Sequence, residues 1–229
     1  MENLLKSFNE IKQKKLSIDL TRGKPHSDQL DLSNDLMTTP VNPIGENNVD
    51  LRNYGEPIGI IEARRLGADI LDSKLDLTIA GEQSSYLLMT QLLLGRYLFG
   101  LDDDPWKNDK EPAFLCAVPG FDRHFATLEG IGLKMHTVNL CSSGIDLDDL
   151  KKKLSKYPNI KGLICVPRHS NPSGEVFSDE NITNLLKITK EYNSSFINLF
   201  DHAYLIHDFD ETRVQTPIPL LADGLDALD

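Results

Sequence analysis

Four short stretches of this 229-residue sequence hold side chains whose types and spacing could do chemistry. The most informative is Asp201-His202-Ala203-Tyr204, which follows an apolar run that ends at Phe200. A carboxylate at that point is placed to hold a cationic ring nitrogen, and Tyr204, three residues on, can face the same way. The alternative for Asp201 alone is the N-cap of a following helix, which is a common use of aspartate.

The second stretch is Ser170-Asn171-Pro172-Ser173-Gly174, which also follows an apolar run. It contains little that could pack in a core, and its prolines and glycine fix a rigid polar loop that presents Asn171. The alternative is a plain connecting turn. The concentration of special residues favours a binding loop.

The third and fourth stretches suit a phosphate and a planar ring. Residues 81–85 open a helix, where free N–H groups and the positive end of the dipole attract an anion. Gln83 and Ser84 would add donors, whereas Glu82 would repel the anion, and a polar N-cap is the alternative. Phe121, on a loop next to a glycine, could stack on a planar ligand or pack in the core.

All four stretches follow apolar, strand-like runs, and from residue 56 such runs alternate with helical patterns. This alternation predicts an α/β fold of three layers, with a mostly parallel sheet that binds ligands at the carboxyl ends of its strands. We expect strands at 76–80, 113–118, 134–140, 160–166 and 195–200. We expect helices from Pro57, over 84–98, after Asp122, and over 146–156 and 178–192.

The beginning of the chain has a different character. Apolar residues recur at helical spacing over 2–15, which predicts a helix. Residues 21–55 are rich in Pro, Asn, Asp and Gly, and we expect them to form an irregular, partly extended arm. The expected organisation is therefore an N-terminal helix and arm over 1–50, followed by the α/β domain over 51–229.

The composition limits the partners. Thirty-five acidic residues against 24 basic ones give a net charge of −11, which repels phosphate backbones and anionic membranes, so we expect no nucleic acid or membrane partner. Cys116, Cys141 and Cys165 lack metal-ligand spacing, as do His202 and His207, so we expect no metal site and buried, reduced thiols at 116 and 165. No signal peptide or apolar stretch of about 18 residues is visible, which favours a cytoplasmic protein.

Asn171 in S-N-P-S-G, followed by Asp201 and Tyr204 in D-x-A-Y, resembles the fold-type I pyridoxal-phosphate (PLP) enzymes, the aspartate aminotransferase superfamily. Three more segments match that family in order and spacing. These are R-G-K-P at 22–25, Y-G-E-P at 54–57 with Gly59 and Arg64-Arg65, and P-G-F-D-R-H at 119–124. The last is similar to a segment of a bacterial, MocR-like aspartate aminotransferase subgroup.

The resemblance implies a fold, a cofactor and a role for each matched residue. The fold would be the large domain of the PLP-dependent transferases. Asp201 would pair with the protonated pyridine nitrogen of PLP, and Asn171 and Tyr204 would hydrogen-bond its phenolic oxygen. The other implied contacts are Phe121 on the ring face, Gln83 and Ser84 on the phosphate, Tyr54 on the phosphate of the neighbouring subunit's cofactor in a homodimer, and Gly23 near the substrate carboxylate.

The chain departs from the family pattern at three places. It reads G-E-Q-S-S where the subgroup commonly has G-G-N-S-S, and R-H-S-N-P-S-G where the subgroup has K-Y-S-N-P-T-G. The family's Schiff-base lysine comes shortly after D-x-A-Y, but the last lysine here is Lys190. We therefore expect a large domain that is incomplete at its C-terminus, without the small domain and its carboxylate-binding arginine.

Three hypotheses about function follow. The first is a PLP-dependent aminotransferase that moves an amino group between an amino acid, aspartate-like in preference, and a 2-oxo acid in the complete protein. This chain would then be a truncated, inactive form. The second is a non-catalytic cofactor-binding or dimerisation remnant, and the third is an α/β domain whose motifs bind nothing.

Overall fold

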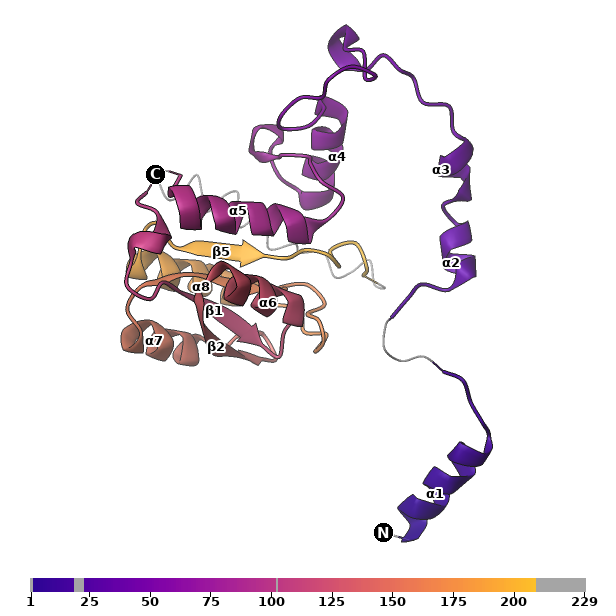
Figure 1. The fold of residues 1–229 in the computed structure, drawn as a ribbon, viewed down its shortest axis with the longest axis vertical. Helices are drawn as coiled ribbons and strands as arrows, with labels where there is room; N and C mark the ends of the chain where they lie inside the picture. The colour runs from indigo at the N-terminus through magenta and orange to yellow at the C-terminus, as the bar shows by residue number, and fades with distance from the viewer. Residues whose placement is uncertain (1, 19–22, 102, 209–229) are drawn as a thin grey trace. The chain divides into compact units, whose positions relative to one another are not determined.

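The structure is a computed structural model that describes residues 2–18, 23–101 and 103–208 (Figure 1). The chain divides into two compact units, Met1–Arg52 and Asn53–Asp229. Arg22 of the R-G-K-P motif and residues 209–229 of the expected α/β domain lie outside the described residues.

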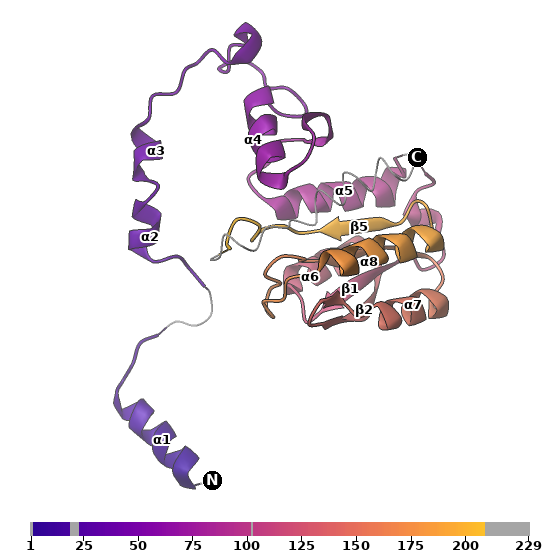
Figure 2. The ribbon, with the colours of Figure 1, turned by 180° about the vertical axis from the view of Figure 1, so that it is seen from behind.

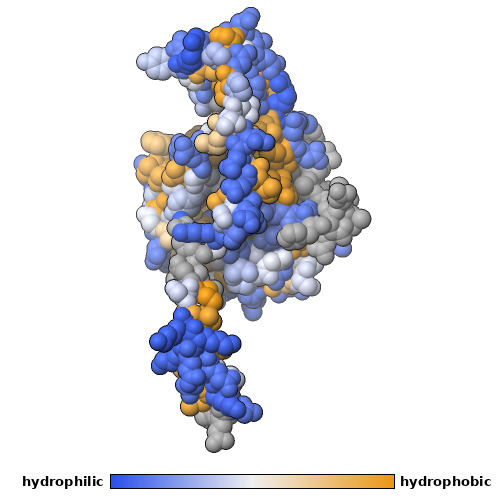
Figure 3. Space-filling model, turned by 90° about the vertical axis from the view of Figure 1, so that its right-hand side faces the viewer, coloured by the Kyte–Doolittle hydropathy of each residue, from blue (hydrophilic) through white to orange (hydrophobic). Residues whose placement is uncertain are grey.

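The first unit consists of short helices, and none of its described residues is buried. Its elements are α1 (Glu2–Gln13), α2 (Ser27–Asp31), α3 (Asn34–Thr38) and the 3-10 turn η1 (Glu46–Asn48). α1 confirms the expected first helix, and hydrophobic side chains among its hydrophilic ones are open to solvent (Figure 3). The expected irregular arm contains α2 and α3 instead, because a capping box between His26 and Gln29 starts α2.

The second unit contains a five-stranded sheet in the order β3-β2-β1-β4-β5. Figures 1 and 2 label β1, β2 and β5 of this sheet from opposite sides. The strands are β1 (Ala113–Val118), β2 (Lys134–Cys141), β3 (Gly144–Ile145), β4 (Ile160–Cys165) and β5 (Ile197–Phe200). β2, β1, β4 and β5 are parallel, and β3 alone runs antiparallel to β2. This arrangement confirms the mostly parallel sheet.

Helices cover both faces of this sheet (Figure 1). These helices are α5 (Ser85–Phe99), α6 (Asp122–Ile131), α7 (Leu147–Lys156) and α8 (Asp179–Tyr192). The unit also contains α4 (Ile61–Leu71) and the 3-10 turns η2 (Leu75–Leu77) and η3 (Trp106–Asn108). Asp146 and Ser178 cap α7 and α8, as expected. The helix expected from Pro57 begins later, at Ile61. Within the described chain, no helix is long and apolar enough to cross a membrane.

The side-chain alternation of β1 divides the core in two. Ala113, Leu115 and Ala117 pack on the side of α7 and α8, whereas Phe114 and Cys116 pack on the side of α5 and α6. All five are at most 5% exposed. A strand buried on both faces is typical of parallel sheets between two helix layers. Because β1 is the central strand, its carboxyl end lies in the middle of the sheet edge formed by the carboxyl ends of the parallel strands.

The prediction of a strand over 76–80 is wrong. The segment begins in η2 and pairs with no strand of the described chain. Arg64 of α4 gives the reason, because its Nε donates to the carbonyl oxygen of Thr78 at 2.8 Å and its Nη2 to that of Leu75 at 2.7 Å. A side chain thus satisfies carbonyls that a strand would offer to a neighbouring strand.

Gly162 in β4 provides a test of the packing between β4 and its neighbours. A Cβ there would lie 2.4 Å from both the Ile197 carbonyl oxygen and the Phe114 ring, so Gly162→Ala should destabilise the fold by about 1–3 kcal/mol. Gly130→Ala is the matched control, because its Cβ would meet open space in α6 and should stabilise by up to about 1 kcal/mol. Urea unfolding followed by circular dichroism measures both. An unchanged midpoint for Gly162→Ala would contradict this packing.

Candidate functional site

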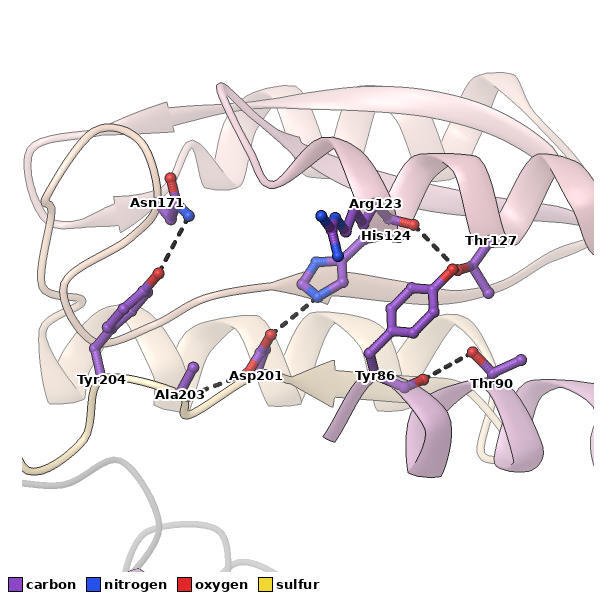
Figure 4. A network of polar contacts seen from close by, with 9 residues as sticks. All are labelled: Tyr86, Thr90, Arg123, His124, Thr127, Asn171, Asp201, Ala203 and Tyr204. Atoms are coloured by element: carbon purple, nitrogen blue, oxygen red, sulfur yellow. Dashed lines mark hydrogen bonds and ion pairs between the residues drawn. The ribbon is translucent and has the colours of Figure 1, made fainter. Parts of the chain in front are cut away.

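One pocket of about 260 Å³ brings five of the expected site residues together. It lies at the carboxyl ends of β1, β4 and β5, beside the N-terminus of α5, and its lining includes Ser84, Phe121, Asn171, Asp201 and Tyr204. Figure 4 shows the last three of these residues. The pocket's volume is near the lower end of the range of small-ligand pockets, which begins at about 300 Å³. These residues span 121 positions of the sequence, from 84 to 204, and only the parallel sheet unites them.

Asp201 directly follows β5 and is 7% exposed. Its Oδ2 lies 2.9 Å from Nε2 of His124, and its Oδ1 accepts from the Ala203 amide at 3.1 Å (Figure 4). Because a carboxylate can only accept, the His124 tautomer with a proton on Nε2 fits this contact. Burial of a charge requires such partners, so this carboxylate is held in one orientation toward the pocket.

Asn171 and Tyr204 meet across two loops (Figure 4). Nδ2 of Asn171 donates to the Tyr204 hydroxyl oxygen at 3.2 Å. Since the tyrosine oxygen accepts this bond, its own proton stays available to donate to a ligand. The pair therefore offers hydrogen-bond donors at the wall of the pocket.

Phe121 lines the pocket as the N-cap residue of α6. Gly120 makes this position possible, because a Cβ at residue 120 would lie 2.4 Å from the Ala117 carbonyl oxygen. The Phe121 ring meets the His124 ring edge-on, with centroids 5.1 Å apart. Phe121 belongs to neither buried core cluster, which favours the ligand-stacking interpretation over the core interpretation.

Ser84 is the N-cap of α5, yet its side chain makes no capping hydrogen bond, and the first turn of α5 contains no acidic residue. Ser84, Ser85 and Tyr86, at the start of this 15-residue helix, line the pocket, and a helix N-terminus suits an anion. Glu82, with φ of 54°, turns away from this end, because its Oε1 accepts from Nε2 of Gln91 at 3.0 Å on the body of the helix. The expected repulsion is weakened accordingly.

Three expected site residues do not line the pocket. Gln83 is absent from its lining although Ser84 beside it is present. Tyr54 is 97% exposed, and Gly23 belongs to the first unit, where a Cβ would meet nothing within 4 Å. The implied roles of Tyr54 and Gly23 concern a neighbouring subunit and a substrate, so they stay predictions.

Sequence reasoning missed several residues of the site, above all His124. The others that line the pocket are Ser85, Tyr86, Arg123, Val166 and Ala203. His124 is the last residue of P-G-F-D-R-H, and its position one helical turn after Phe121 was the available signal. Tyr86 joins α5 to α6, because Thr127 Oγ1 donates to its hydroxyl oxygen at 2.6 Å (Figure 4).

The buried thiols near the site are inert. Cys116 and Cys165 are 2% and 3% exposed, as expected. Burial raises the pKa of Cys116 to about 12 and that of Cys165 well above its usual range, with the Asp201 charge adding to the second effect. Both therefore stay protonated at neutral pH and are poor nucleophiles.

A fold of this kind with these residues at its strand ends is that of a PLP-dependent transferase, and comparison with known families agrees. The family model described as aspartate amino-transferase matches residues 1–223. The chain therefore belongs to the aspartate aminotransferase family.

Individual relatives can be named. The chain is 35% identical over 210 residues to an aspartate aminotransferase of Corynebacterium glutamicum. The matched region covers 90% of this chain and 48% of that protein. The crystal structure of an aspartate transaminase from C. glutamicum superposes with a TM-score of 0.85 at 33% identity, over 98% of this chain and 54% of that one. The chain spans about half the length of these relatives.

A more distant likeness shows the fold alone. The crystal structure of an α-aminoadipate aminotransferase from Thermus thermophilus, in complex with N-(5'-phosphopyridoxyl)-L-leucine, is 20% identical with a TM-score of 0.59. It covers 76% of this chain and 41% of that one.

His202, next to Asp201, gives a pH test. Burial lowers its pKa from 6.5 to about 4, the Arg168 charge lowers it too, and the Asp201 charge opposes both; neither ring nitrogen has a hydrogen-bond partner among the described residues. Between pH 6.5 and 4, His202 is protonated in the unfolded chain but neutral in the folded one. The free energy of unfolding is therefore highest above pH 6.5 and falls as the pH decreases through 4.

This loss should reach about 3 kcal/mol at pH 4, and His202→Phe should remove it while keeping a ring against Phe200. Urea unfolding of both proteins at several pH values between 4 and 7 measures the effect. Parallel stability profiles for wild type and variant would contradict a buried neutral His202.

Proposed function

We propose that this chain forms the PLP-binding half of an aminotransferase site. The observation that carries the proposal is the buried Asp201 carboxylate at the base of the pocket, oriented by His124 and flanked by the Asn171–Tyr204 pair. The donor set fits PLP in charge, because a carboxylate lies where a cationic ring nitrogen would bind and a helix N-terminus where a phosphate would bind.

When bound, PLP supplies an electron-withdrawing ring that stabilises negative charge on an amino acid's α-carbon. Asp201 would hold the proton on the pyridine nitrogen, and His124 would keep the carboxylate aimed at it. Asn171 and Tyr204 would donate to the phenolic oxygen, Phe121 would cover one face of the ring, and Ser84 with the first amides of α5 would bind the phosphate.

The finer assignments rest on the family. We infer that the whole protein moves an amino group between an amino acid and a 2-oxo acid, with aspartate preferred, because the two C. glutamicum relatives carry the names aspartate aminotransferase and aspartate transaminase. We also infer a cytoplasmic homodimer, in which Tyr54 reaches the phosphate of the neighbouring subunit's cofactor. Gln83 contacts the phosphate of its own subunit's cofactor, and Gly23 lies near the substrate carboxylate. The 97% exposure of Tyr54 supports the homodimer, since the tyrosine ring is available to a second copy.

The alternative function is binding without turnover. The 229 residues contain no lysine after Lys190, which lies in α8 before Asp201, whereas transamination needs a lysine amine at the PLP ring.

Asp201→Asn should weaken PLP binding by about tenfold to a hundredfold, because it removes a charge-assisted hydrogen bond of about 1.5–3 kcal/mol while keeping the shape of the side chain. Absorbance titration with PLP measures the dissociation constant. Glu180→Gln, an exposed change on α8, is the control and should bind like wild type. Equal affinities of wild type and Asp201→Asn would refute the site assignment.

The 229-residue chain should show no transaminase activity above that of free PLP, since no lysine matches the catalytic position. The assay uses aspartate and 2-oxoglutarate with the aspartate aminotransferase of C. glutamicum as positive control. Turnover by the chain above the free-cofactor rate would exclude the binding-only alternative and show that another group replaces the lysine.

A further inference from the structure

A second set of bonds joins the Asn171 loop to the Tyr204 loop outside the pocket lining. The Asp208 carboxylate accepts from both Nε and Nη2 of Arg168, with an Nε–Oδ1 distance of 3.2 Å. The same Oδ1 lies 2.6 Å from Nε2 of His169. Arg168 and His169 stand three and two residues before Asn171, and Asp208 stands four residues after Tyr204.

The chemistry of this contact makes it a strong constraint. The Arg168 side chain is only 4% exposed, so its guanidinium needs a counter-charge inside the protein. A two-pronged bond between guanidinium and carboxylate fixes the relative orientation of both groups. Arg168 first, and His169 after it, hold the pKa of Asp208 below its usual range, so the carboxylate is charged at neutral pH.

The backbone around Tyr204 explains why such a constraint matters. The pairing of β4 with β5 ends at Cys165 and Phe200, and the Asp201 amide still donates to the Cys165 carbonyl oxygen at 2.9 Å. Beyond that point, backbone hydrogen bonds form within each loop. In the Tyr204 loop, the His207 amide donates to the Tyr204 carbonyl oxygen. The Asn171–Tyr204 bond, at 3.2 Å, is at the long end of the hydrogen-bond range.

We propose that Asp208 is a positioning residue, which with Arg168 and His169 holds Tyr204 against Asn171 and so places the two donors meant for the ring's phenolic oxygen. This inference rests on the proposed function. A lysine at residue 168 could not form the two-pronged bond that the Arg168 guanidinium makes with Asp208.

A double-mutant cycle with PLP as the probe tests this role. In the wild-type background, Asp208→Asn should weaken PLP binding about fivefold, the equivalent of one neutral hydrogen bond. In the Tyr204→Phe background, the same substitution should weaken PLP binding less than about twofold. Asp208→Glu, which keeps the charge, should restore part of the affinity. Asp109→Asn is the matched control, because it breaks a 2.6 Å ion pair with Lys161 at the amino end of β4 and should leave affinity unchanged.

Hydrogen exchange separates positioning from general destabilisation. In Asp208→Asn, amides in 166–178 and 201–208 should exchange faster while those of β1 do not change. No loss of affinity, an equal loss with and without Tyr204→Phe, or faster exchange in β1 as well would overturn the proposal. If wild type binds no PLP, the proposed function fails and exchange alone decides, with faster loop exchange supporting the positioning role and unchanged loops overturning it.

Discussion

The contact between Asp201 and His124 is the constraint on which the site depends. A carboxylate at the end of a central-layer strand is stable only when hydrogen-bond donors surround it, and one of these donors comes from 77 residues earlier in the chain. His124 reaches Asp201 because β1, which precedes α6, pairs with β4, and β4 pairs with β5. The strand order is therefore what makes an aspartate tolerable at this position.

The same arrangement gives the pocket a polarity. Its base is a carboxylate, whereas one end holds the first turn of α5, with a partial positive charge and an uncommitted Ser84 hydroxyl. A molecule with a cation at one end and an anion at the other matches both ends at once, which neither a dianion nor a simple amine would do. Phe121 and Asn171 also line this pocket.

The parts predicted well from sequence are those in which local pattern and topology agree. The ends of buried parallel strands lie at one sheet edge, so Asn171, Asp201 and Tyr204 could be expected together before any coordinates. His124 was missed, although it lies one helical turn after Phe121, because its role depends on a partner 77 residues away. The strand expected at 76–80 fails for a similar reason, since Arg64 satisfies its carbonyls, and the Glu82 carboxylate is directed by Gln91, nine residues on.

The position of β5 also has a consequence for biosynthesis. Among the described strands it is the last to be translated and lies at an edge of the sheet, next to β4. A ribosome adds about 5–20 residues per second, so β1, β2 and β4 leave it seconds before Asp201 does. During that interval His124 and the rest of the half-built pocket face an open sheet edge. A ligand that needs Asp201 therefore cannot guide the pairing of β1 with β2 and β4, and it can bind only once β5 has paired with β4.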